Sequence, residues 1–196
     1  MGALRPEHGA LSKAADTDDG WPAEIQRFLE CHPRSTWPTS KSAAATFWLE
    51  VHDHLRRDAA GLTAASTDYR ASPSQLAAVA APRLRGLVAA MHGHHQIEDF
   101  HYFPALRRAE PTLAAGFDRL EREHVTLNRS IDAALTALRE LHAAVEVTAA
   151  TSSPATAQLA VQRYVDAAAA LRRELEGHLN DEENLVVPLL AAHGDH

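Results

Sequence analysis

Several features that define common protein classes are scarce or missing in this 196-residue chain. Cys31 is the single cysteine, which excludes an internal disulfide and a cysteine-based zinc site. No apolar run approaches the roughly 20 residues that a membrane-spanning helix needs. Lysine occurs at two positions only, and the formal net charge is −7, so we expect no nucleic-acid partner and no membrane partner. The first residues lack the apolar segment of a secretory signal, and we therefore expect a cytoplasmic protein.

Glycine is also scarce, with nine residues, whereas alanine, the strongest helix former, occurs 39 times. A short helix is expected at 22–32, followed by a proline-bounded connector at 33–38. A looser stretch at 66–81 contains Pro73 and is expected to form one short helix. Breakers divide the rest of the chain into four long helical segments, at about residues 42–65, 82–108, 111–147 and 154–192.

Four long helices with short connections predict an all-α fold, an antiparallel up-down-up-down four-helix bundle with an N-terminal extension. We expect the bundle at residues 42–193 and an N-terminal arm with a short helix at residues 1–41.

Histidine is the residue in excess: the chain has 13, and six lie between His52 and His101. Each long segment carries a histidine within the apolar stripe that spacings of three and four residues define. Two of the stripes add a glutamate four residues after the histidine. The stripes are Ala45-Trp48-His52-Leu55-Ala59-Leu62, Leu84-Leu87-Met91-His94-Glu98-His101-Ala105, Leu113-Phe117-Leu120-His124-Leu127-Ile131-Leu138 and Leu171-Leu175-His178-Glu182-Leu185-Leu189.

These polar residues also lie at similar heights along the predicted bundle. Residues on consecutive antiparallel helices are level when they are equally far from the connecting turn. Glu98 and His124 are about equally far from the turn near Pro111, to within one helical turn at about 1.5 Å per residue. The same holds for His124 and His178 about the turn near Ser152. We therefore expect four histidines and two glutamates in one layer of the core: His52, His94, Glu98, His124, His178 and Glu182.

Burying these groups without partners would be prohibitively costly, and a bound cation removes that cost. The i, i+4 spacing places His94 with Glu98, and His178 with Glu182, on one face of each helix. Six donors exceed what one metal ion normally takes from a protein, and each carboxylate can bridge two ions. Imidazole and carboxylate ligands without a thiolate indicate iron, and manganese or zinc fits less well.

Several positions keep alternatives open. Any one of these histidines taken alone would more often be a hydrogen-bonded core residue, so the indication comes from the six together. A less apolar stripe runs through His54, so His54 competes with His52. His95 lies at the flank of its stripe and His101 lies beyond Glu98; each is a candidate for an additional ligand or for a polar group beside the site. Two acids are candidates for orienting the histidines, or are simply exposed: Glu183 and Asp99.

At these residues the chain resembles the hemerythrin-like family, the HHE cation-binding domains. The resemblance covers about residues 42–192 and rests on His52-Asp53-His54-Leu55-Arg56-Arg57, His94-His95-Gln96-Ile97-Glu98-Asp99 with Phe103-Pro104, Glu123-His124, and His178-Leu179-Asn180-Asp181-Glu182-Glu183 with Val187-Pro188. It implies two Fe ions, joined by an oxo bridge, on the same six residues. Glu98 and Glu182 would bridge the ions and the histidines would cap them.

The chain departs from the oxygen-carrying hemerythrins at two places. Those proteins have a second histidine one turn after the first on the third helix, where this chain has Asn128. They also carry His-x-x-x-x-Asp on the fourth helix, where this chain has His178 and Glu182. A missing histidine ligand leaves an open coordination position, which favours reactivity over reversible storage. Three residues are candidates to replace the ligand or to relay protons: His54, His95 and His101.

The resemblance therefore implies a non-haem di-iron protein that reacts with O2, peroxide or NO, through peroxide-consuming or oxidase-type chemistry, with Asn128 and His101 beside the pocket. A non-catalytic sensor or binding protein for O2, NO or iron, signalling through the helix ends or the N-terminal arm, is the alternative. A biosynthetic di-iron oxygenase is a third candidate, because three small residues leave room near the layer: Ala59, Gly93 and Ala105. The sequence identifies neither the substrate nor the oligomeric state.

Overall fold

A computed structural model describes residues 20–37, 42–151 and 154–193, and every regular element in these ranges is helical. Residues 1–19 of the predicted N-terminal arm and the predicted domain boundary at 41 lie outside the described residues. In chain order the elements are α1 (Ala23–Cys31), the 3-10 turn η1 (Arg34–Thr36), α2 (Ala43–Asp68), α3 (Pro73–Ile97), the π-helical turn η2 (Glu98–Tyr102), α4 (Phe103–Ala109), the 3-10 turn η3 (Pro111–Leu113), α5 (Ala114–Thr151) and α6 (Pro154–His193).

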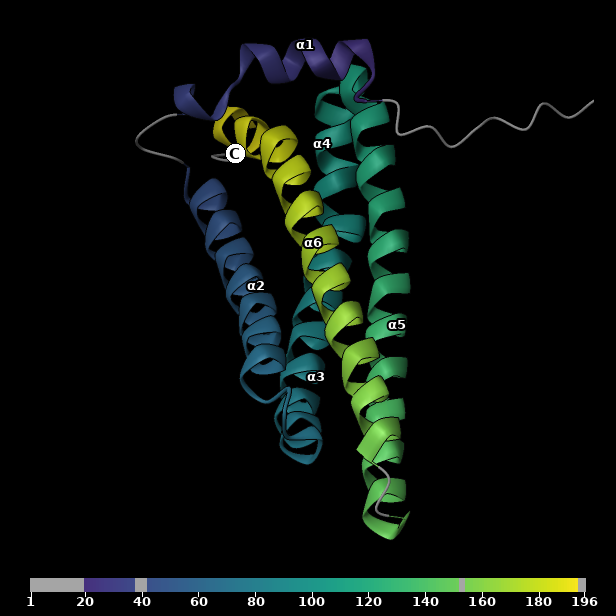
Figure 1. Ribbon diagram of the computed structural model, residues 1–196. Helices are drawn as coiled ribbons and strands as arrows, with labels where there is room; N and C mark the ends of the chain where they lie inside the picture. Colours follow the sequence, from purple (N-terminus) through teal and green to yellow (C-terminus); the bar gives the residue numbers. More distant parts are fainter. Residues whose placement is uncertain (1–19, 38–41, 152–153, 194–196) are drawn as a thin grey trace, which may run out of the picture.

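The long helices form a bundle in which α2, α3, α5 and α6 lie side by side (Figure 1). The most extensive pairings are α5 with α6 and α2 with α6. Helix α4 continues α3 beyond the π-helical turn, and α1 lies across one end of the bundle (Figure 1). None of the described helices is long and apolar enough to cross a membrane. The prediction of an all-helical fold is confirmed.

The second long helix begins nine residues earlier than predicted, at Pro73 rather than Pro82. The boundary was expected at Pro82 because an interior proline removes one backbone hydrogen bond, at a cost of about 3 kcal/mol. This prediction was wrong. Here the preceding turns bury Leu76, Ala77 and Ala80 at 0–2% exposure, and this packing outweighs the local defect.

The π-helical turn changes which residues of the following helix face the core. A π turn contains one residue more than an α turn, so the side chains beyond it are displaced by one position around the helix axis. The stripe therefore continues from Glu98 to Phe103 and Leu106, which are buried. His101 and Ala105, which uninterrupted α-helical spacing placed on the core face, are exposed.

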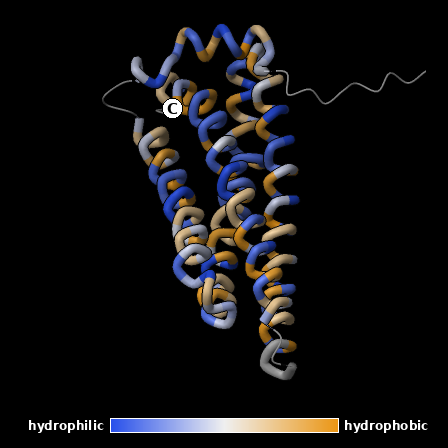
Figure 2. The backbone as a smooth tube through the Cα atoms, viewed as in Figure 1, coloured by the Kyte–Doolittle hydropathy of each residue, from blue (hydrophilic) through white to orange (hydrophobic). Residues whose placement is uncertain are grey.

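A polar layer divides the hydrophobic core into two clusters. One cluster contains Leu55, Met91, Leu127 and Leu175, and the other lies toward α1 and contains residues such as Phe117. Helices α2, α5 and α6 each pass from one cluster to the other at the histidine or glutamate of their stripe, and α3 does so through its continuation α4. Figure 2 shows hydrophobic and hydrophilic residues alternating along these helices, as expected for helices with one buried face.

Helix α1 closes one end of the bundle. Ile25 is fully buried there, against the core cluster that includes Leu185. Gly116 permits this close approach, because a Cβ atom at this position would lie 2.8 Å from Leu185 Cδ2 and 3.2 Å from Ile25 Cδ1. At the same end, the Ser42 hydroxyl accepts a hydrogen bond from the Ala45 amide and caps α2, while donating to the Leu190 carbonyl of α6.

Candidate metal centre

The polar layer gathers seven buried side chains from four helical segments. The six residues that the stripes selected all lie in it. His95 joins them. The side chains fall into two groups whose nitrogen and oxygen atoms lie within 4.8 Å of one another: His52, His94, Glu98 and Glu182, and His95, Glu98, His124 and His178.

The two carboxylates in the layer are buried without hydrogen bonds to their oxygens. Glu98 and Glu182 are both 0% exposed. Both oxygens of each lack a hydrogen-bond partner, as do the Nε2 atoms of three imidazoles: His95, His124 and His178. These seven atoms make up most of the unpartnered buried side-chain nitrogens and oxygens in the described part of the chain. Such a concentration in one layer indicates a group that the protein chain alone does not provide.

The separations between these atoms match those of ligands around a shared ion. Atoms about 2.1 Å from one metal ion lie about 3.0 Å apart at right angles and about 3.4 Å apart in a tetrahedron. His52 Nε2 is 3.0 Å from His94 Nε2, and His94 Nε2 is 2.7 Å from Glu98 Oε1. On the other side, His124 Nε2 is 3.4 Å from Glu98 Oε2. Glu182 contacts both sides. Its Oε1 atom lies 3.4 Å from His52 Nε2, and its Oε2 atom lies 3.4 Å from His178 Nε2.

The opposite nitrogen of three of these imidazoles meets a carboxylate. His52 Nδ1 lies 3.0 Å from Glu183 Oε1, and His124 Nδ1 lies 3.1 Å from Asp99 Oδ1. His178 Nδ1 lies 3.0 Å from Glu123 Oε2. A carboxylate accepts the Nδ1 proton and leaves the Nε2 lone pair directed into the layer, which is the tautomer that metal ligation requires.

Arginines hold two of these carboxylates in turn. Glu183 contacts Arg56 at 2.5 Å and Arg34 at 2.7 Å. Burial opposes its ionisation, but the hydrogen bonds from His52 and Arg56 prevail and lower its pKa to about 2. Glu123 is held by Arg119 at 2.8 Å, and its pKa is lowered in the same way.

The layer's own carboxylates are driven in opposite directions. Burial raises the pKa of Glu98 well above its ordinary value, and the neighbouring charge of Glu182 adds to that shift. Burial also disfavours ionised Glu182, but the adjacent imidazoles of His52 and His178 lower its pKa well below the ordinary value. The chain without a cation therefore keeps one charged and one neutral carboxyl group, and a cation would stabilise both as carboxylates.

Three imidazoles are held neutral. Burial is the main cause that lowers the pKa of His94 to about 4, of His124 to about 3 and of His95 to about 2. Burial also acts on His178, but its hydrogen bond to Glu123 and the nearby negative charge of Glu182 raise its pKa to about 9. Neutral imidazoles carry the lone pair that a metal ion needs.

Three of the additional candidates lie away from the layer. His54 is exposed and faces Asp58 on the surface of α2, 3.4 Å away, because it lies two residues, about 200° around the helix, from His52. His101 is exposed because of the π-helical turn, and Asn128 is exposed on α5. Both were expected beside the pocket, but the side chains of both are exposed to solvent.

One functional residue was missed. Glu123 was noted only as the neighbour of His124, yet its carboxylate holds His178 across the α5–α6 pair. Its signal in the sequence is Arg119 four residues earlier, which pairs with it at 2.8 Å on one face of α5. The two acids that were anticipated, Asp99 and Glu183, both contact layer histidines.

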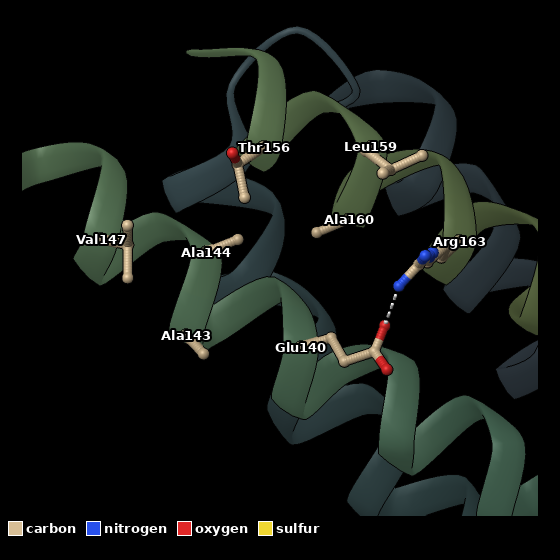
Figure 3. Close-up of a pocket in the computed structure, with 8 residues that line it drawn as sticks. All are labelled: Glu140, Ala143, Ala144, Val147, Thr156, Leu159, Ala160 and Arg163. Atoms are coloured by element: carbon tan, nitrogen blue, oxygen red, sulfur yellow. Dashed lines mark hydrogen bonds and ion pairs between the residues drawn. The ribbon is translucent and has the colours of Figure 1, made fainter. Parts of the chain in front are cut away.

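Surface hollows lie along α5 and α6 in the described part of the chain, and two of them differ in their distance from the layer. The first, toward the end of these helices away from α1, is lined mainly by apolar side chains such as Ala144 and by one ion pair, Glu140–Arg163 at 3.1 Å (Figure 3). It contains none of the seven residues of the layer. The second reaches His178 itself and is bordered by Glu123 and Gly177.

A family model matches most of the sequence. The hemerythrin HHE cation-binding domain matches residues 43–190, which include every residue of the layer. No match was found among curated proteins or among solved structures. Because the family match spans most of the chain, the resemblance noted from the histidine motifs is confirmed, and the chain belongs to the hemerythrin HHE cation-binding domain family.

Proposed function

We propose that this protein is a hemerythrin-like non-haem di-iron protein whose centre reacts with a small oxidant: O2, peroxide or NO. The proposal includes the antiparallel up-down-up-down arrangement of four helical segments around the centre. The observation that carries it is the set of seven buried, unpartnered ligand-type atoms in one layer.

Two ions account for this layer better than one. Glu98 belongs to both groups of neighbouring donor atoms, and Glu182 contacts histidines of both. Each glutamate has two oxygens, so each can bind one ion with each oxygen. His52 and His94 would complete one half of the centre, and His124 and His178 the other.

Iron fits the donor atoms. The layer offers imidazole nitrogens and carboxylate oxygens, and Cys31, the single thiol, lies exposed in α1. Such mixed nitrogen and oxygen ligands suit iron, and suit manganese or zinc less well. When bound, two iron ions would supply electron exchange with the oxidant and a Lewis-acidic position for it.

The chain's own residues prepare this chemistry. The carboxylates of Glu183, Asp99 and Glu123 fix the orientation and tautomer of three imidazoles. The two hydrophobic clusters on either side of the layer limit the access of water, which strengthens electrostatic interactions inside it.

A sensor that binds without turnover is the second candidate, and one contact favours it. Arg34, in the segment before the bundle, binds the carboxylate that orients His52. The oxygenase candidate loses support, because Gly93 and Ala105, two of the small residues expected to leave room for a substrate, lie on the surface.

Metal analysis of the purified protein tests the proposal. We expect about two iron ions per chain after expression in iron-rich medium, with charge-transfer absorption in the oxidised state. Replacing both bridging residues, Glu98→Gln with Glu182→Gln, should abolish iron binding, whereas Glu176→Gln, on the partly exposed face of α6, should not. An iron-free protein whose melting temperature does not respond to added iron would contradict the proposal.

Oxidant consumption separates the two candidate functions. Reduced protein is mixed with O2 or peroxide in the presence of an excess of electron donor. Consumption well beyond one equivalent per centre indicates an enzyme, and consumption that stops at one equivalent indicates a sensor or binding protein.

A further inference from the structure

We propose that His95 is a seventh ligand, which supplies from α3 the histidine that α5 lacks at Asn128. The inference rests on the proposed di-iron function and assigns three histidines to one half of the centre and two to the other. The open coordination position would then lie on the half formed by His52 and His94.

The position of His95 along α3 allows this role. Consecutive residues of an α-helix are about 100° apart around its axis, so His94 and His95 reach different halves of the layer. Glu98 is four residues after His94 and three after His95, which places it on the same face between them. One helical turn and a half thus provides a ligand to each half and the glutamate shared by both.

The ring contacts place His95 in the half that contains α5 and α6. Its imidazole stacks on that of His124, with centroids 3.8 Å apart and planes inclined by 13°. It meets His178 edge-on, at 5.6 Å. His94 instead lies against His52, with ring centroids 4.9 Å apart. The two neighbouring histidines of α3 therefore serve different halves.

The Nε2 atom of His95 is buried and has no partner among the described residues. The residue is 5% exposed, and its Nε2 atom has no hydrogen-bond partner. A histidine that only filled space in the core would be expected to pair this nitrogen, because a buried unpaired polar atom is costly.

Asn128 is in no position to contribute. It lies one turn after His124 on α5, but its side chain is exposed to solvent. A histidine at position 128 would therefore not take over the role of His95.

Metal titration of the otherwise intact chain tests the inference. Fe²⁺ and the redox-inert probe Co²⁺ are titrated against a competing chelator into the wild type and His95→Ala, with circular dichroism to verify folding. We expect His95→Ala to lose at least tenfold in affinity for one of the two ions and to change the Co²⁺ ligand-field spectrum. His92→Ala, an exposed histidine of the same helix, is the matched control and should behave as the wild type.

Chemical rescue distinguishes ligation from packing. His95→Gly should recover the second ion and the wild-type spectrum when imidazole is added, whereas Asn128→His combined with His95→Ala should recover neither. If His95→Ala fails to fold, His95→Gln replaces it, since a polar side chain of similar size keeps the packing.

The outcomes separate the two proposals. A wild type that binds no metal ion overturns the di-iron function itself. A wild type and a His95→Ala variant that bind two ions with equal affinity and equal spectra overturn the role of His95 alone.

Discussion

Glu183 Oε1 lies 3.0 Å from Nδ1 of His52, and the guanidinium of Arg34 lies 2.7 Å from Oε2 of the same carboxylate. Arg34 belongs to η1, outside the four long helices, so this carboxylate connects the N-terminal segment to a candidate metal ligand. A second connection starts at Trp21, whose ring lies 4.4 Å from the guanidinium carbon of Arg119. Arg119 holds Glu123, which orients His178: the N-terminal segment thus reaches both halves of the centre.

Replacing Arg34 should change the redox properties of the centre while leaving it assembled. Arg34→Ala removes a positive charge and leaves Glu183 a stronger acceptor for the His52 proton. Both effects favour the oxidised metal, so we expect the midpoint potential to fall by tens of millivolts, a modest change because Arg34 is 45% exposed. Redox titration measures it. Arg27→Ala, an exposed arginine of α1, is the control, and equal potentials in both variants would contradict the connection.

Replacing Glu183 itself should weaken metal binding. Glu183→Gln retains the size of the side chain but loses the charge that accepts the His52 proton, and such changes typically cost about 10- to 100-fold in metal affinity. Chelator competition measures the loss. Glu176→Gln, on the same helix and paired with Arg172, provides the comparison. Unchanged affinity in Glu183→Gln would show that His52 does not depend on this carboxylate.

The fold and the layer were accessible from the sequence because helical periodicity and distance from the turns are local properties. The more apolar stripe favoured His52 over His54. In the structure His52 is fully buried, whereas His54 is exposed to solvent. Equal distances from the turns placed His124 and His178 in one layer, where their ring centroids are 4.8 Å apart.

The remaining features depend on interactions that no local pattern records. The π-helical turn moves His101 out of the core, and an inserted residue in a helical turn has no signature in hydrophobic spacing. His95 lies off the ideal stripe and reaches the layer because α5 and α6 pack against that flank of α3. Glu123 was missed because its partner, His178, is 55 residues away in the sequence.

Two glycines should respond in opposite directions to alanine. Gly86 is exposed within α3, and an added Cβ atom would meet nothing within 4 Å. Gly86→Ala should therefore stabilise the protein by about 0.5–1 kcal/mol, because alanine loses less backbone freedom in a helix. Gly116→Ala should destabilise it, since the new Cβ atom would lie 2.8 Å from Leu185 Cδ2 in the buried contact with α1. Urea unfolding measures both, and equal effects would contradict the packing described at Gly116.

The metal-free protein should be most stable near pH 6.5. Below this pH the unfolded chain protonates three histidines that the folded chain keeps neutral, since burial lowers the pKa of His94, His95 and His124. The unfolded state then binds more protons, and stability falls as the pH falls. Three acids with raised pKa values oppose this trend, namely Glu98, Asp99 and Asp181. Three glutamates with lowered pKa values reinforce it, so the histidine effect prevails: Glu123, Glu182 and Glu183.

Above pH 6.5 the balance reverses. The folded chain keeps the proton of His178, whose pKa is raised to about 9, and the raised pKa values of His52 and Glu98 act in the same direction. The folded state then binds more protons than the unfolded state, so stability falls as the pH rises toward 9. Urea unfolding at pH 5, 6.5 and 9 tests both limbs. In the iron-loaded protein the free energy of unfolding should not fall between pH 6.5 and pH 9, because bound metal replaces these protons. A free energy of unfolding of the metal-free protein that stays constant or rises above pH 6.5 would contradict the assignment.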